Sequence, residues 1–152
     1  IDLLSTRAAD LAQELREHLS EKFHAAIRVR EIGEGRGYRL FQVQKSGNRH
    51  LVDIRPVLEL PPAQRIEDVL VIAPADLIAG KVIAYHQRRG KPKSGTDWRD
   101  LAMLLLKFPE LKSEQGAVAD KLQASGATAE ILVVWKELAA QEIQPEDDTD
   151  EF

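Results

Sequence analysis

The sequence predicts an α+β fold in which a mixed β-sheet flanked by helices precedes a C-terminal helical bundle. Three observations lead to this prediction. Apolar residues recur at helical spacing near the start of the chain, alternating segments bounded by turn residues follow, and the remainder has helical spacing again. A strand, a helix, three or four strands and then a run of helices is an element order typical of α+β proteins.

The first part of the chain predicts the sheet and one helix. Ile1–Leu4 is typical of the end of a strand, and Ser5 or Thr6 is expected to cap a helix that runs to about Lys22. The apolar residues of that helix share one face: Ala8, Leu11, Ala12, Leu15, Leu19 and Phe23. Strands are expected next at 27–31, 38–45 and 49–57, joined by turns at 33–37 and 46–48, with a short strand at 69–72.

The second part predicts four helices, at about 75–89, 97–107, 113–123 and 128–141. Pro74 precedes the first of them, and Gly90–Gly95 ends it. Thr96 is expected to cap the second, whose opening acidic residues suit the positive end of the helix dipole. The predicted organisation is therefore a sheet region at 1–73, a helical region at 74–143 and an acidic, disordered tail at 144–152.

Composition limits the classes of protein. The 152 residues include no Cys, which excludes disulfides and thiolate metal sites and fits the reducing cytoplasm. No apolar run approaches the roughly 18 residues that a membrane helix needs, and no secretory signal is visible. The net charge of −4 gives no general argument for nucleic-acid binding. Because the chain starts abruptly on a strand with Ile1, an N-terminal segment is expected to be missing.

Asp2 and Asp53 are the candidate metal ligands and catalytic residues. Each lies between apolar residues in a strand-like context, and neighbouring strands could bring them together. Converging carboxylates provide the hard oxygen ligands that Mg²⁺ prefers, and such a site can hold a nucleoside triphosphate. The alternative is an exposed aspartate on a half-buried strand. If the carboxylates are adjacent, their mutual repulsion predicts that Asp53→Asn leaves folding nearly intact.

Lys81, Arg88, Asp97 and Asp100 are further candidates. Lys81 lies in an apolar helix, where it could bind phosphate as a point charge or merely cover apolar surface with its stem. Arg88 begins a short basic run, 88–93, which could contact phosphate or be a solvated loop. The two aspartates could be no more than a charge pattern at a helix start. The four histidines have no metal-ligand spacing, and the two tryptophans are expected to be packing residues.

The order of these motifs resembles that of the AbiE-type toxin nucleotidyltransferases, a bacterial branch of the polymerase-beta-like superfamily. The matching segments are Ile1-Asp-Leu-Leu4, Leu51-Val-Asp-Ile-Arg55, Asp76-Leu-Ile-Ala-Gly-Lys81, Arg88 and Asp97-Trp-Arg-Asp-Leu101. The resemblance covers roughly residues 1–108 and implies a nucleotidyltransferase-like sheet. It also implies that Asp2 and Asp53 bind Mg²⁺, that Lys81 and Arg88 or Arg89 serve the nucleotide, and that Asp97 and Asp100 orient them.

The implied activity is transfer of a nucleotidyl group from a nucleoside triphosphate to a hydroxyl of RNA or protein, and an antitoxin is an implied partner. The chain departs from the family pattern because it lacks the Gly-Ser element and the first Asp of the Asp-x-Asp strand. As given, it is therefore expected to be inactive. The alternative function is that of a non-catalytic interaction or regulatory protein that keeps the nucleotidyltransferase fold.

Overall fold

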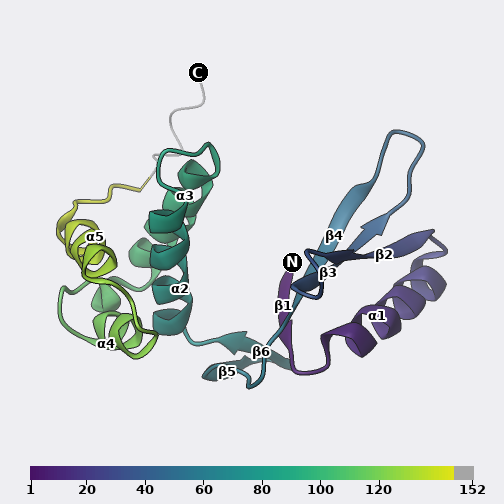
Figure 1. Cartoon of the computed structure of the whole chain (residues 1–152), viewed down its shortest axis with the longest axis horizontal. Coiled ribbons are helices and arrows are strands. Elements are labelled where there is room, and N and C mark those ends of the chain that lie inside the picture. The colour runs from purple at the N-terminus through teal and green to yellow at the C-terminus, as the bar shows by residue number, and fades with distance from the viewer. Residues whose placement is uncertain (146–152) are drawn as a thin grey trace. The chain divides into compact units, whose positions relative to one another are not determined.

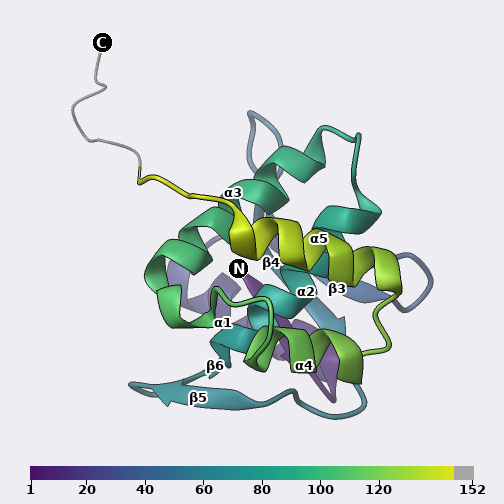
Figure 2. The ribbon, with the colours of Figure 1, turned by 90° about the vertical axis from the view of Figure 1, so that its left-hand side faces the viewer.

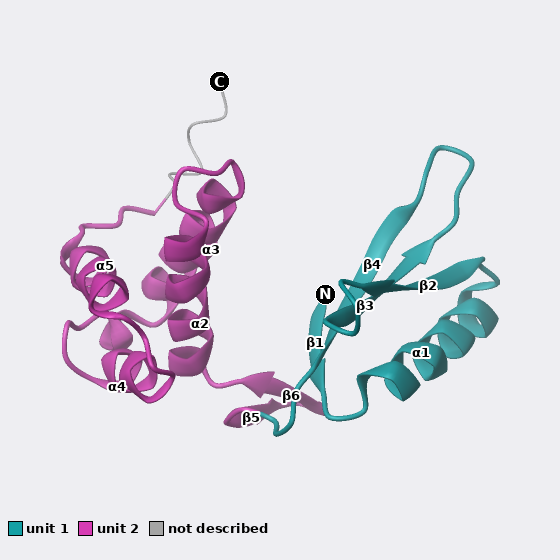
Figure 3. Cartoon of the chain, in the orientation of Figure 1, with its two compact units in different colours: residues 1–60 teal, residues 61–152 magenta. Residues whose placement is uncertain are grey.

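The computed structural model describes residues 1–145 and divides the chain into two compact units, residues 1–60 and 61–152 (Figure 3). The mixed sheet, the single helix packed on it and the later group of helices confirm the predicted α+β class. Of the predicted acidic tail, residues 146–152 lie outside the described part of the chain.

The first unit is a four-stranded sheet with one helix (Figure 1). The strands lie in the order β1-β4-β3-β2, with β1 parallel to β4 and the other neighbours antiparallel. Their bounds are β1 Asp2–Ser5, β2 Ile27–Ile32, β3 Gly37–Gln42 and β4 Arg49–Pro56, and the helix is α1 Ala8–Phe23. The parallel pair exists because α1 carries the chain away from β1 before the sheet continues.

α1 covers one face of this sheet, and the core of the unit lies between them. The buried apolar residues alternate along each strand with polar ones, as a sheet covered on one side requires. They are Ala8, Ala12, Ile27, Leu40, Val52 and Ile54. The other face, which we call the open face, carries the alternate residues of each strand, and no element of residues 1–60 covers it.

A β-bulge interrupts the pairing of β3 with β4. Leu40 is opposite Val52, but the next residue, Phe41, is opposite His50, so Leu51 is an extra residue on β4. A bulge of this kind shifts the alternation of side chains along one strand. Here it turns both Leu51 and Val52 toward the core, while His50 and Asp53 face the open side.

The second unit begins with a two-stranded hairpin, β5 Ala63–Ile66 and β6 Val69–Ile72, and continues with helices. The helices are α2 Pro74–Gln87, α3 Lys93–Lys107, α4 Ala117–Ala124 and α5 Ala129–Ala140, with a short 3₁₀ turn at Pro109–Leu111. α2 contacts α3, α4 and α5 (Figure 2). The core includes Ile78, Val82, Leu101, Leu122 and Trp135.

Three local predictions were wrong. β5 was not expected, because Ala63–Ile66 is exposed throughout and shows no apolar alternation. α3 begins at Lys93 rather than Asp97, so Thr96 lies inside the helix and caps nothing, and no acidic residue occupies the first turn. α1 begins after Arg7, although the hydroxyl of Ser5 does accept a hydrogen bond from the Arg7 N–H at 3.1 Å.

Trp135 is 1% exposed and Trp98 is partly buried against the same core, which confirms both as packing residues. Among residues 1–145, no helix has the length and apolar character needed to cross a membrane.

Candidate functional site

Four charged residues form a row across the open face, one from each strand. In the strand register, Asp2 is beside Asp53, Asp53 is opposite Arg39, and Arg39 is opposite Arg30. Paired residues of neighbouring strands project from the same face of a sheet. The structure therefore brings together the two carboxylates that the sequence proposed as metal ligands. It places Arg39 next to Asp53, with Arg30 beyond Arg39.

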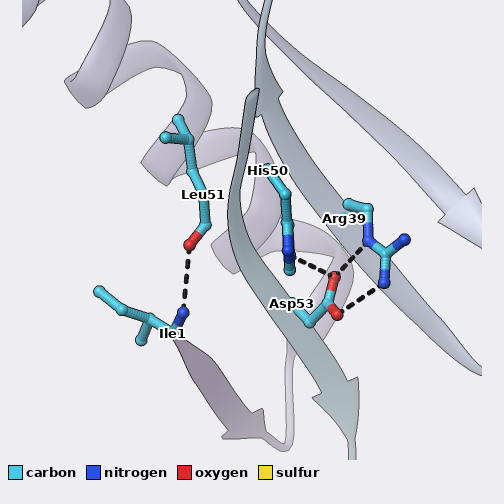
Figure 4. A network of polar contacts seen from close by, with 5 residues as sticks. All are labelled: Ile1, Arg39, His50, Leu51 and Asp53. Carbon is cyan, nitrogen blue, oxygen red and sulfur yellow. Dashed lines mark hydrogen bonds and ion pairs between the residues drawn. The ribbon is translucent and has the colours of Figure 1, made fainter. Parts of the chain in front are cut away.

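Two side chains, Arg39 and His50, contact the carboxylate of Asp53 (Figure 4). Arg39 donates from Nε to Oδ1 at 2.7 Å and from Nη2 to Oδ2 at 2.8 Å, which is the bidentate geometry that guanidinium and carboxylate favour. Nε2 of His50 lies 3.1 Å from Oδ1. The hydrogen bonds from Arg39 lower the pKa of the Asp53 carboxyl, and the same bonds raise the pKa of Arg39.

The bulge explains how His50 reaches Asp53. Residues three apart in a regular strand point to opposite faces, because side chains alternate with a period of two. The extra residue Leu51 restores His50 to the face that carries Asp53. The contact therefore depends on backbone geometry that the sequence alone does not reveal.

Main-chain hydrogen bonds fix the position of β1 beside β4. The Asp53 N–H donates to the carbonyl of Ile1 at 2.9 Å, and the Ile1 amine donates to the carbonyl of Leu51 at 3.2 Å (Figure 4). These bonds set the register that places Asp2 beside Asp53.

The expectation that repulsion dominates at Asp53 is wrong. The carboxylate has two direct cationic or polar partners, and its pKa is lowered, whereas repulsion from Asp2 would raise it. Sequence reasoning missed Arg39 and His50. The alternation of Tyr38–Gln42 assigns Arg39 to the open face, but nothing in the sequence shows which residue of β4 lies opposite.

The helical unit holds a second set of the predicted residues. Lys81 on α2 pairs with Asp100 on α3, and both side chains are about one-third exposed. This contact argues against a lysine that merely covers apolar surface with its amine in open water. Asp97 and Asp100 lie inside α3 rather than at its start, and each contacts a cationic residue of α2 or its end.

Arg88, directly after α2, donates from Nη1 to both carboxylate oxygens of Asp97, at 2.8 and 3.0 Å. The Asp97 side chain is only 4% exposed, and a buried carboxylate requires such a partner. Asp97 is therefore a structural anchor of the α2–α3 pair. Of the two arginines that the sequence left open, Arg88 rather than Arg89 makes this contact.

The carboxylates of the row fit Mg²⁺ in donor type but do not form a closed protein cage. Mg²⁺ commonly binds through one or two carboxylates together with substrate phosphates and water. Asp2 and Asp53 supply two hard oxygen donors side by side. Within residues 1–145, no cluster of three or more His, Asp or Glu side chains could hold a metal by itself, so phosphate oxygens would have to complete the coordination.

The comparison with known families decides the identity of the chain. The sequence model described as "Nucleotidyl transferase AbiEii toxin, Type IV TA system" matches residues 1–151. The chain belongs to the AbiEii nucleotidyltransferase family. This confirms the family that the order of motifs suggested.

A solved structure and the curated proteins add little to the family assignment. The crystal structure of an antigenic nucleotidyltransferase-like protein from Paracoccidioides brasiliensis is similar at 17% identity and a TM-score of 0.35, over 81% of this AbiEii chain and 68% of that one. This likeness is too distant to carry an argument about the site. No curated protein matches the chain.

Proposed function

We propose that this AbiEii chain supplies Asp2 and Asp53 as Mg²⁺ ligands to a nucleotidyltransferase, which transfers a nucleotidyl group from a nucleoside triphosphate to a hydroxyl of RNA or protein. Activity also needs the Gly-Ser element and the first Asp of the Asp-x-Asp strand, which the chain as given lacks. The observation that carries the proposal is the register of β1 with β4, which sets the two carboxylates side by side on the open face. In the reaction, the acceptor oxygen bonds to the α-phosphorus and pyrophosphate leaves. When bound, Mg²⁺ would neutralise phosphate charge and favour the in-line displacement.

Asp53 is better suited to hold a cation than to accept a proton. Its lowered pKa keeps the carboxylate ionised at neutral pH, and a weaker base is a poorer proton acceptor. We assign Asp53 to the metal and to orienting the acceptor hydroxyl. Asp2, which is exposed and directly beside it, supplies the second carboxylate ligand.

In the helical unit, we assign Lys81 to the triphosphate. Asp100 holds the amine in place, while the one-third of the Lys81 side chain that remains exposed leaves it open to a phosphate oxygen. Arg88 is held by the buried Asp97, so we propose that this pair fixes the end of α2 and that Arg88 has a smaller share in nucleotide binding.

Isothermal titration of the full-length parent, which would also carry the Gly-Ser element and the first Asp of the Asp-x-Asp strand, with Mg²⁺ and each of the four nucleoside triphosphates tests the proposal. At least one nucleotide should bind, and Asp53→Asn should weaken Mg²⁺-dependent binding by about tenfold or more, since a metal ligand is lost. Asp10→Asn, which removes an exposed carboxylate from α1, is the matched control and should leave binding unchanged. A folded protein that binds none of the four nucleotides would overturn the proposal.

A second candidate function is a non-catalytic protein of the same fold. The observation in its favour is that both oxygens of Asp53 already accept hydrogen bonds from Arg39. In this case Mg²⁺ alone and Mg²⁺–nucleotide would both fail to bind. In either case we propose an antitoxin protein as the partner, since the family description names a toxin of a type IV toxin–antitoxin system.

A further inference from the structure

We propose that Arg39 and Arg30 form a phosphate-binding subsite next to the two carboxylates, which takes the polyphosphate of the nucleoside triphosphate. The inference rests on the proposed function for the identity of the ligand. The row thus has a cation-binding end, Asp2 and Asp53, and an anion-binding end, Arg39 and Arg30.

Arg39 has N–H donors that its bonds to Asp53 do not use. A guanidinium carries five N–H donors, and the two bonds to Asp53 use one from Nε and one from Nη2. Among residues 1–145, no acceptor is hydrogen-bonded to Nη1, since the two bonds of Arg39 come from Nε and Nη2. The side chain is 46% exposed, so a phosphate can reach it from solvent. Release from Asp53 would free two further donors in the planar arrangement that matches phosphate oxygens.

Arg30 lies directly opposite Arg39 on the neighbouring strand. Arg39 is paired with Asp53, whereas among residues 1–145 no carboxylate forms an ion pair with Arg30. Like charges at opposed positions of an antiparallel pair destabilise the sheet, so the two arginines repel each other once Arg39 leaves Asp53. Its guanidinium carbon lies 5.6 Å from the centre of the Phe41 ring, a contact that positions the group but does not neutralise it. A bound anion would relieve the repulsion between the two arginines.

The position of the subsite favours a triphosphate over a nucleic-acid backbone. Arg39 is the immediate cross-strand neighbour of Asp53, so the phosphates nearest to it are those that share the metal of Asp2 and Asp53. Arg39 would then exchange partners, holding Asp53 in the free protein and phosphate in the complex. This exchange also explains why Asp53, a proposed metal ligand, is paired with Arg39 in the free protein.

The test uses inorganic tripolyphosphate in metal-free buffer at low salt, so that it does not depend on Mg²⁺ or on activity. Calorimetric titration should show binding to the wild type, weakened about fivefold in Arg39→Gln and about threefold in Arg30→Gln. Asp53→Asn should strengthen binding about fivefold because it frees Arg39. The double variant Asp53→Asn, Arg39→Gln should bind no better than Arg39→Gln.

Two variants on α1 control for charge alone. Arg16→Gln and Asp10→Asn remove the same charges from the helix that covers the other face, and each should change the affinity by less than about twofold. The inference is overturned if Asp53→Asn acts no more strongly than Asp10→Asn, or if its effect persists without Arg39. It is also overturned if a single-stranded oligonucleotide of equal phosphate concentration displaces tripolyphosphate.

A spectroscopic measurement covers the case in which a variant fails to fold. In the wild type, tripolyphosphate should shift the Nε–Hε resonance of Arg39 in a proton–nitrogen correlation spectrum, and an unshifted resonance at saturation overturns the inference. Failure of the proposed function looks different. If tripolyphosphate behaves as expected but Mg²⁺–nucleotide does not bind, the subsite stands and the nucleotidyl-transfer proposal does not.

Discussion

Asp53 shows how one side chain can be both a stabilising partner and a candidate metal ligand. Its side chain is only 16% exposed, and the bonds from Arg39 and His50 lower the free energy of its charged form. A cation that binds Asp53 must compete with this pairing. The ion pair therefore stabilises the sheet at some expense to metal affinity.

Removing the ion pair should cost little stability. Asp53→Asn and Arg39→Gln are each expected to lower the free energy of unfolding by about 1 kcal/mol, because Arg39 is 46% exposed and water screens the pair. The double variant should lose less than the sum of the two single losses, since only one interaction is removed. Urea unfolding measures all three, and strictly additive losses would show that the pair contributes nothing.

The pairing also predicts how stability depends on pH. The folded-state pKa of Asp53 lies below its unfolded value, so the folded protein gains stability from this group above about pH 3.9 and loses it as the pH falls through the lower, folded-state pKa. The difference in unfolding free energy between the wild type and Asp53→Asn should be constant above about pH 5. Below that it should shrink, and a difference that grows on acidification would contradict the assigned direction.

The sequence identified Asp2 and Asp53 because a carboxylate between apolar strand residues is conspicuous. It did not identify Arg39 or His50. Their contacts with Asp53 depend on the β3–β4 register and on an extra residue in β4, and both are set by packing rather than by local preference.

At the level of elements, the ion pair between Arg88 and Asp97 holds α2 and α3 together, and its two side chains differ in exposure. Asp97 is 4% exposed, while Arg88 is 31% exposed, so the carboxylate depends on the arginine more than the reverse. Arg88→Ala would leave a charge buried without its partner, and this is expected to lower the free energy of unfolding by about 3 kcal/mol.

The neighbouring arginine supplies the control for that variant. Arg89 is exposed, and Arg89→Ala removes the same charge and is expected to change stability by less than about 0.5 kcal/mol. Thermal or urea unfolding of both variants checks the prediction. Equal losses would mean that Asp97 finds another partner.

The elements themselves were predictable where the apolar pattern was strong. α1, β2, β3, β4, β6 and the four later helices follow the predicted segments within a few residues. The exceptions have physical reasons. Thr96-Asp97 resembles a helix start, but the preceding Lys93–Gly95 already has helical conformation, and the exposed strand β5 forms by pairing with β6 rather than by burying a face.

At the scale of the whole molecule, the buried apolar residues among positions 1–145 fall into two separate clusters, one in each unit. Leu40 is fully buried in the sheet unit, and both tryptophans lie in the other unit. Leu40→Ala is expected to destabilise the sheet unit by about 3 kcal/mol through the cavity that it leaves.

The two clusters predict that this damage stays local. Hydrogen exchange should quicken for the amides of β2–β4, while the unfolding transition followed by tryptophan fluorescence should keep its midpoint. A fluorescence midpoint that falls together with the protection of the strands would show that the units unfold as one cooperative structure.

Because β4 contains an extra residue, relatives of this chain should be compared by the face of the sheet on which each residue lies. A fixed sequence distance from the aspartate is not enough. In a homologue that lacks one residue at Leu51 the strand is regular, so the residue two positions before the aspartate shares its face and the residue three positions before it faces α1. The sequence distance between the aspartate and its neighbour on the same face therefore changes from three to two with the length of the strand, without any substitution. Sequence variation in β4 should be judged by changes in strand length as well as by changes in residue type.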